Sequence, residues 1–212
     1  SRGLGDVYKR QPYTFADTWK RTDTDGRRWR AFWERQGLPS QAVAYICDPE
    51  ETELDALITD RRVRVLGVVI TAVDRIMHGM QLGTAGLQQQ VRQWAEGGNL
   101  TVLLNRLREV GFACWLTSDH GNIEATGIGV PKEGVLVEAR GQRVRIYESE
   151  GFRRRAYAQV PEALVWTPEG LPDGLCLLLA PGRSAFLRQG ETAVCHGGIA
   201  LEEVVVPFVR LY

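Results

Sequence analysis

The sequence predicts an α/β fold with a mostly parallel sheet flanked by helices. Three apolar segments, at residues 41–47, 63–74 and 112–119, are predicted to be buried strands, and the second of them is rich in β-branched residues. Residues 49–60, between the first two segments, begin with acidic residues, as many helices do. Because parallel strands need crossovers of about a dozen residues or more, we expect these strands to be joined by helices.

The expected helices are marked by apolar residues that recur on one face. Trp29, Phe32 and Trp33 have the i, i+3, i+4 spacing of an amphipathic helix, and Gly37 is a suitable stop. Two more helices are expected before and after the break at residues 97–98. Their apolar faces are Leu87, Val91 and Trp94, then Leu100, Leu103, Leu104 and Leu107. These helices would return the chain to the strand at residues 112–119.

The second half of the chain has a different pattern. Residues 134–149 alternate in polarity on both sides of Gly141, which predicts a β-hairpin excursion from the main sheet. Residues 150–160 predict a short helix, so we interpret 130–160 as a small insertion in a domain that spans 12–212. Further strands are expected at residues 163–168, 174–181 and 202–212.

Bulk composition excludes several classes of protein. Lys plus Arg and Asp plus Glu number 26 each, so no global field would recruit nucleic acid or an anionic membrane, and an anionic substrate needs a local site. The four cysteines form no C-x-x-C pair, which favours a reduced, cytoplasmic protein. No segment approaches the roughly 18 to 20 apolar residues of a membrane span.

The N-terminal segment Ser1–Gln11 is polar and lacks periodicity. We expect it to be a non-native tail, in which case the native protein continues upstream and this chain is a fragment.

Every histidine of the chain stands in a motif that could bind metal. Asp74 precedes His78 by four residues, Asp119 directly precedes His120, and His196 is followed by two glycines. Carboxylate and neutral imidazole are ordinary ligands of zinc and manganese, and loops beyond the carboxyl ends of strands can bring them together. Three clusters could thus form one polymetallic site, although each motif alone is more often a solvated turn or loop.

Arginines near the predicted hairpin turn are candidates for binding a phosphate or a nucleic-acid backbone. Arg140 and Arg143 stand on either side of the turn, and a guanidinium can offer a bidentate fork to a phosphate. A solvated basic face of the hairpin is the equally plain alternative.

The motifs together resemble the PglZ domain, a branch of the alkaline phosphatase superfamily. The resemblance rests on D-x-x-x-H at Asp74–His78, S-D-H-G at Ser118–Gly121 and "HGGIALEEVVVPFV" at His196–Val209, of which the last is the most specific. It extends through "RGQRVRIY" and back to "WRAFWERQGL", and it covers most of residues 12–212. The fold that it implies is the alkaline-phosphatase-like α/β fold.

The resemblance implies two divalent metal ions, with zinc or manganese expected. By analogy with the superfamily, Asp74, His78 and His196 would hold the first ion, and Asp119 and His120 the second. Gly121 would let the chain turn away from the crowded metal. The implied mechanism is in-line attack on phosphorus by a metal-activated Ser or Thr, followed by hydrolysis of the phospho-enzyme.

The nucleophile is not among the matched residues. In the family it lies, with the first aspartate, before the segment that matches "PYTFADTWKR", so we expect it upstream of this chain and expect the 212-residue chain alone to be inactive. The resemblance implies a role in phage resistance in BREX-type systems, with other system proteins, and DNA or another phosphodiester, as candidate partners. There are two alternatives. The chain could belong to a non-catalytic scaffold of the same complex, or to a superfamily enzyme that acts on small phosphates.

Overall fold

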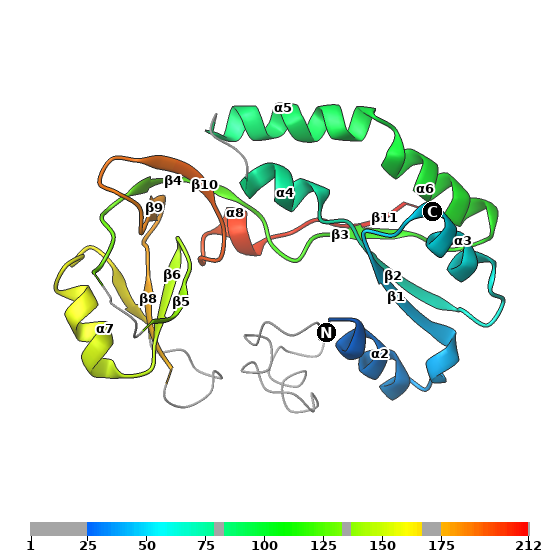
Figure 1. The fold of residues 1–212 in the computed structure, drawn as a ribbon, viewed down its shortest axis with the longest axis horizontal. Helices are drawn as coiled ribbons and strands as arrows, with labels where there is room; N and C mark the ends of the chain where they lie inside the picture. Colours follow the sequence, from blue (N-terminus) through cyan, green and yellow to red (C-terminus); the bar gives the residue numbers. More distant parts are fainter. Residues whose placement is uncertain (1–24, 79–82, 133–136, 167–174, 212) are drawn as a thin grey trace. The chain divides into compact units, whose positions relative to one another are not determined.

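A computed structural model describes residues 25–78, 83–132, 137–166 and 175–211. These residues fall into two compact units. Unit 1 lies within Gly127–Gly190, and unit 2 lies within Asp23–Thr126 and Glu191–Tyr212. The mixed α/β class expected from the sequence is confirmed (Figure 1).

Unit 2 is built around a pair of parallel strands, β1 (Val43–Cys47) and β2 (Val65–Val69), joined by α3 (Glu51–Thr59). Its other elements follow in chain order. They are α2 (Asp25–Arg35), α4 (Ala72–His78), α5 (Gly83–Glu96), α6 (Asn99–Glu109), β3 (Trp115–Thr117), β4 (Ile123–Gly127), β10 (Thr192–Cys195), α8 (Leu201–Val204) and β11 (Phe208–Arg210). A single-turn 3₁₀ helix, Ser40–Ala42, precedes β1.

Helices pack on both faces of the β1–β2 pair. Successive side chains of β2 point to opposite faces, so each face contacts a different helix. Leu66 and Val68 of β2 pack with α3 and α6, in a cluster whose buried members are Leu54, Ile58, Leu107 and Cys114. Gly67 faces the other way, against α2, and a Cβ there would lie 2.9 Å from the Trp29 ring. This close approach explains why a glycine interrupts an otherwise β-branched strand.

The apolar run at residues 63–74 divides into a strand and a helix. β2 ends at Val69 and α4 begins at Ala72, where the Arg75 amide donates to the Thr71 carbonyl. A continuous apolar run fits a buried strand and a buried helix equally well, so its pattern alone did not reveal the break. Asp74 therefore lies in the first turn of a helix rather than at the end of a strand.

Strand β3 pairs with β11 in an antiparallel ladder, in which Leu116 faces Val209. Parallel pairing is found at β1–β2, whereas β4–β10, β3–β11, β5–β6, β6–β8 and β7–β8 are antiparallel. The strand β11 comes from the apolar C-terminal segment. Because it pairs with β3 in the antiparallel direction, the two strands need no crossover helix between them.

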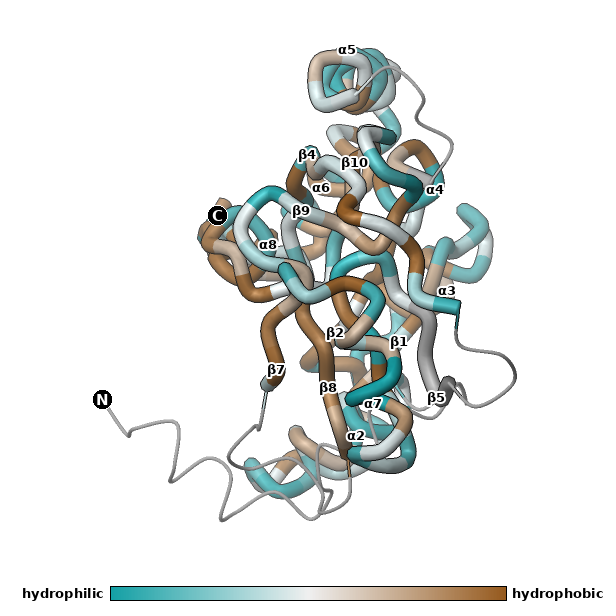
Figure 2. Tube along the Cα trace, turned by 90° about the vertical axis from the view of Figure 1, so that its left-hand side faces the viewer, coloured by the Kyte–Doolittle hydropathy of each residue, from teal (hydrophilic) through white to brown (hydrophobic). Residues whose placement is uncertain are grey.

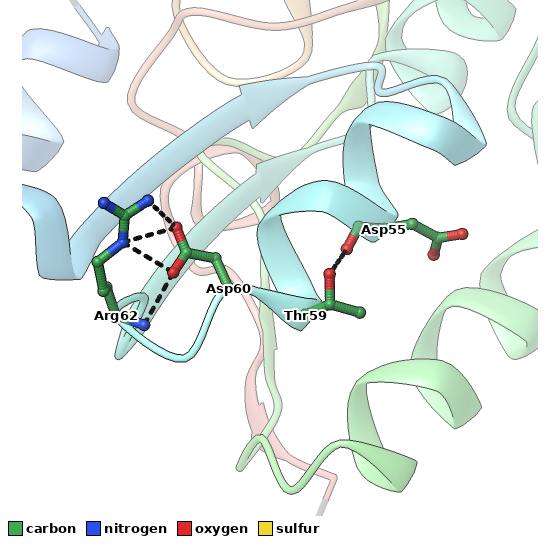
Figure 3. A network of polar contacts seen from close by, with 4 residues as sticks. All are labelled: Asp55, Thr59, Asp60 and Arg62. Carbon is green, nitrogen blue, oxygen red and sulfur yellow. Dashed lines mark hydrogen bonds and ion pairs between the residues drawn. The ribbon is translucent and has the colours of Figure 1, made fainter.

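A polar turn ends α3 and leads into β2 (Figure 3). The Arg62 side chain donates to both carboxylate oxygens of Asp60, and the Thr59 hydroxyl donates to the Asp55 carbonyl oxygen. Hydrogen bonds from the Arg62 side chain and amide lower the pKa of Asp60 to about 2. These contacts are exposed, and they shape the turn rather than the core.

A second packing centre of unit 2 joins α4, α5 and β10. Met77, Leu87 and Val194 are its buried members, with Ile76 and Val91 packed against them. The Glu124 carboxylate on β4 accepts a hydrogen bond of 2.6 Å from the Thr84 amide, in the first turn of α5. Packing and capping thus bind α4 and α5 to the β4–β10 ladder.

Unit 1 has a four-stranded antiparallel sheet in the order β5–β6–β8–β7. The strands are β5 (Val137–Arg140), β6 (Val144–Tyr147), β7 (Leu164–Trp166) and β8 (Cys176–Leu179), with helix α7 (Glu150–Tyr157) and the short β9 (Ser184–Ala185). β5 and β6 pair on either side of Gly141, and β8, apolar along its length in Figure 2, pairs with both β6 and β7. The hydrophobic core of unit 1 includes Tyr147, Leu178 and Phe186.

No helix in the described ranges combines the length and the apolar character that crossing a membrane would need.

Candidate metal centre

Three side chains from separate segments of unit 2 converge at one point. Asp74, His120 and His196 each present a possible ligand atom, and these atoms all lie within 4.8 Å of one another. Asp74 comes from α4, His120 from the turn between β3 and β4, and His196 from the loop after β10. Residues up to 122 positions apart in the sequence therefore form one polar group.

The helix that carries Asp74 is held by Asp48, which follows β1. The Asp48 carboxylate accepts hydrogen bonds from the Thr71 amide (2.8 Å), the Thr71 hydroxyl (2.5 Å) and Arg75 Nη1 (2.7 Å). Hydrogen bonds from Thr71, then those from Arg75, lower the pKa of Asp48 to about 2. Asp48 therefore ties the end of β1 to the start of α4.

The antiparallel ladder of β4 and β10 brings the two histidines together. Cys195, at the end of β10, pairs with Ile123, at the start of β4. His196 follows Cys195 directly and His120 precedes Ile123 by three residues, so both histidines leave the same end of the ladder. Their imidazole rings stack with centroids 4.1 Å apart and an interplanar angle of 6°.

The His120 ring is oriented by its own turn. Its Nδ1 lies 3.1 Å from the Gly121 carbonyl oxygen. Because a carbonyl only accepts, this hydrogen bond places the proton on Nδ1 and leaves Nε2 as the nitrogen that can bind a metal. The His120 side chain is 29% exposed, and its Nε2 lies 3.8 Å from Oδ1 of Asp119, beyond hydrogen-bond distance.

The spacing of the three ligand atoms fits a divalent cation. Ligands about 2.0–2.2 Å from one ion lie at most about 4.4 Å from each other. The observed limit of 4.8 Å thus requires only small side-chain rotations for all three residues to reach one ion. One carboxylate and two imidazoles are a donor set suited to zinc or manganese.

The family model described as the BREX system PglZ alkaline phosphatase-like domain matches residues 6–211. The chain belongs to the PglZ family. Comparison with curated proteins gave no match. Membership confirms the resemblance inferred from the Asp/His motifs and from the HGG segment. It places the PglZ domain in a superfamily that typically binds divalent metals, for which Asp74, His120 and His196 are a possible site.

The structure groups residues from both ligand sets predicted for this PglZ domain. Asp74 and His196 were expected at the first ion and His120 at the second. Two ions about 3.5–4 Å apart would have adjoining ligand sets, so this grouping is compatible with a dinuclear site. Asp119 is not part of the group among the described residues, and its side chain is 90% exposed. Its carboxylate accepts from the His120 amide at 3.0 Å.

Two of the predicted site residues have side chains outside the described part of the structure. His78 is the last residue of α4, and Arg140 the last residue of β5. Their roles stay predictions.

Arg143 lies in unit 1, where it is 1% exposed. Its guanidinium donates to the carbonyl oxygens of Ser184 and Gly182. The structure therefore gives Arg143, which directly precedes β6, a part in holding the segment Gly182–Ser184 at the start of β9, and its binding to substrate stays a prediction.

Sequence reasoning missed two acidic residues of this region, Asp48 and Glu203. Asp48 has a positive φ of 44°, which is uncommon outside glycine, and its position directly after a predicted strand was an available signal. It also lines a cleft of about 420 Å³ with Arg75, Trp94 and Arg106. Glu203 stands in a run of ordinary helix residues, "ALEEV", and no pattern distinguished it from Glu202.

Gly121 is required for a reason other than the expected turn. It is not among the described glycines with a positive φ. A Cβ at this position would overlap the carbonyl oxygen of Glu202. Glycine therefore lets the turn that carries His120 lie directly against the main chain of α8.

Proposed function

We propose that this PglZ domain provides metal ligands to a phosphatase or phosphodiesterase that serves bacterial phage resistance. The convergence of Asp74, His120 and His196 carries the proposal. A scaffold would have no need to gather three metal-binding side chains from distant segments, whereas phosphoryl transfer requires concentrated positive charge.

The predicted ligands would form two sets, each of which binds one divalent ion, zinc or manganese. Asp74 and His196, with His78, would hold one ion, and His120 and Asp119 the other. Such ions supply charge stabilisation at the phosphoryl group and activate a nucleophile. The hydrogen bond from His120 Nδ1 to Gly121 fixes which nitrogen faces the ion, and the contacts of Asp48 with Thr71 and Arg75 fix the helix that carries Asp74.

The nucleophile, a Ser or Thr, is proposed to precede the part of the chain that matches "PYTFADTWKR". We accordingly expect the 212-residue chain to bind metal without turnover. Other proteins of the phage-defence system are the proposed partners, and DNA or another phosphodiester is the proposed substrate class.

The test separates metal binding from catalysis. The chain is titrated with Zn²⁺ and Mn²⁺, and a protein extended with its native upstream sequence is assayed on a phosphomonoester, a phosphodiester and DNA. We expect metal-dependent diester cleavage by the extended protein and none by its Asp74→Asn variant. Metal binding without any hydrolysis would favour the scaffold, and preference for the small monoester would favour a small-phosphate enzyme. Robust turnover by the 212-residue chain would contradict the proposal that the nucleophile lies upstream of it.

A further inference from the structure

Glu203 is a buried acidic residue beside the candidate metal centre. It lies in α8 and is 2% exposed. Its carboxylate accepts hydrogen bonds from the amides of Gly198 (2.8 Å, to Oε1) and Ala200 (3.0 Å, to Oε2). Both amides belong to the loop that begins at His196, so the side chain of Glu203 closes this loop onto α8.

The main chain of the same residue holds the other histidine segment. The Gly121 amide donates to the Glu203 carbonyl oxygen at 2.8 Å. Gly121 directly follows His120, and its lack of a side chain permits this approach. One residue thus contacts the two segments that carry the stacked imidazoles of His120 and His196.

We propose that Glu203 is a positioning residue that holds His120 and His196 at the spacing a metal ion requires. The proposal rests on the proposed function, because it concerns the same metal centre. Glu203 itself binds no metal in this account and acts through the two segments.

The geometry favours this role over ordinary helix capping. The hydrogen bond from Ala200 is a cap of α8, since it satisfies an amide at the start of that helix. The bond from Gly198 lies outside the helix and is not needed to cap it. The bond from Gly121 satisfies a carbonyl near the end of α8, and it does so from the segment that carries His120. Burying a carboxylate is costly unless its oxygens are satisfied, and two convergent amides offset that cost while fixing the loop.

The first test compares Glu203→Gln with Glu202→Gln. Glu202 is the preceding residue of the same helix, and its side chain is exposed. Each variant therefore removes one negative charge from neighbouring positions of α8, but only Glu203→Gln changes a buried carboxylate. The carboxamide introduced by Glu203→Gln would present its NH₂ to a backbone N–H that needs an acceptor. Competition titration with Zn²⁺ should show affinity lowered by roughly 10–100-fold for Glu203→Gln and unchanged within about twofold for Glu202→Gln.

A second readout needs no metal. NMR of the imidazole groups in the metal-free chain should show the His120 and His196 signals shifted in Glu203→Gln, because the ring stacking is lost, and unchanged in Glu202→Gln. Wild-type Zn²⁺ affinity together with unshifted imidazole signals in Glu203→Gln would overturn the proposal. If the wild-type chain binds no Zn²⁺, the proposed function fails, and the metal-free imidazole signals still decide the role of Glu203.

If Glu203→Gln does not fold, the wild-type chain provides the test by amide hydrogen exchange. The amides of Gly121, Gly198 and Ala200 should show similar protection relative to their intrinsic exchange rates, because Glu203 accepts a hydrogen bond from each of them. Unrelated protection at Gly121 and Gly198 would overturn the proposal.

Discussion

The histidine centre of unit 2 and the buried arginines of unit 1 are both polar clusters, and they use their polar atoms in opposite ways. In unit 1, Arg143 and Arg145 are 1% and 6% exposed. The guanidinium of Arg143 donates to two backbone carbonyls, and that of Arg145 lies over the Phe186 ring. In unit 2, His120 is held through Nδ1, its Nε2 lies 3.8 Å from the Asp119 carboxylate and so forms no hydrogen bond with it, and its side chain is 29% exposed.

The difference shows how a structural polar residue can be told from a candidate site residue. Residue type does not decide the matter, since arginine beside a turn suits phosphate as well as histidine suits metal. A residue is structural when its polar atoms already form hydrogen bonds within the protein, and it is a candidate site residue when an atom that could bind a ligand does not. The comparison predicts that substitutions in unit 1 will change stability and that substitutions in the histidine centre will change metal affinity.

The largest effect is expected for His196→Ala. Loss of one of three ligands should lower Zn²⁺ affinity by more than the roughly 100-fold that marks the upper range for supporting residues. The free energy of unfolding of the metal-free chain should change by less than about 1 kcal/mol, because the side chain is only half-buried. Zn²⁺ titration and urea denaturation measure the two quantities. Unchanged Zn²⁺ affinity would remove His196 from the centre.

Arg143→Met should show the reverse pattern. Its removal leaves the Ser184 and Gly182 carbonyls without their donors in a part-buried setting, which should lower the free energy of unfolding by about 2 kcal/mol. Zn²⁺ affinity should stay at the wild-type value. Arg155→Met, at an exposed position of α7, is the control and should change stability by less than about 0.5 kcal/mol. A stable Arg143→Met variant would break the distinction between the two clusters.

Gly121→Ala sharpens the comparison at the backbone level. The added Cβ would overlap the Glu202 carbonyl oxygen, so the His120 turn must move away from α8. We expect about tenfold weaker Zn²⁺ binding, in the range for residues that support ligands. Gly151→Ala is the matched control, because its Cβ would meet nothing closer than 3.9 Å and it lies in helix α7. That variant should be stabilised by about 0.5 kcal/mol, with unaltered Zn²⁺ affinity.

The smallest effect concerns Asp48 and is pH-dependent. Its pKa is about 2 in the folded chain against an ordinary value of 3.8, so its ionised form stabilises the fold above pH 4. This contribution is lost as the pH falls through about 2. Since the side chain is 32% exposed, we expect about 1 kcal/mol. The difference in unfolding free energy between wild type and Asp48→Asn should therefore shrink between pH 4 and pH 2. A constant difference would contradict the assigned hydrogen bonds.

Local sequence patterns predicted much of this molecule. The apolar spacing of Trp29 and Trp33 located α2, and the alternation around Gly141 located the β5 and β6 pair. The Asp/His motifs named three residues, Asp74, His120 and His196, that converge in the structure, because metal chemistry restricts residue types strongly. These features depend on neighbours within a few positions of the chain.

Features set by distant contacts were not predictable in this way. The pairing of β3 with β11 depends on a segment about 90 residues away, and the approach of His120 to His196 depends on the register of β4 and β10. Glu203 looks like any helix glutamate in the sequence, and only its burial and its three backbone contacts distinguish it. The end of β2 and the start of α4 were hidden because both are apolar.

We expect Asp74, His120 and His196 together to bind a divalent metal ion. The most direct measurement is anomalous diffraction at the zinc edge from crystals of the chain grown with Zn²⁺. We expect a peak among the three side chains, about 2.0–2.2 Å from the Asp74 carboxylate and from one nitrogen of each imidazole. A map at saturating Zn²⁺ with no peak among these side chains would contradict the account.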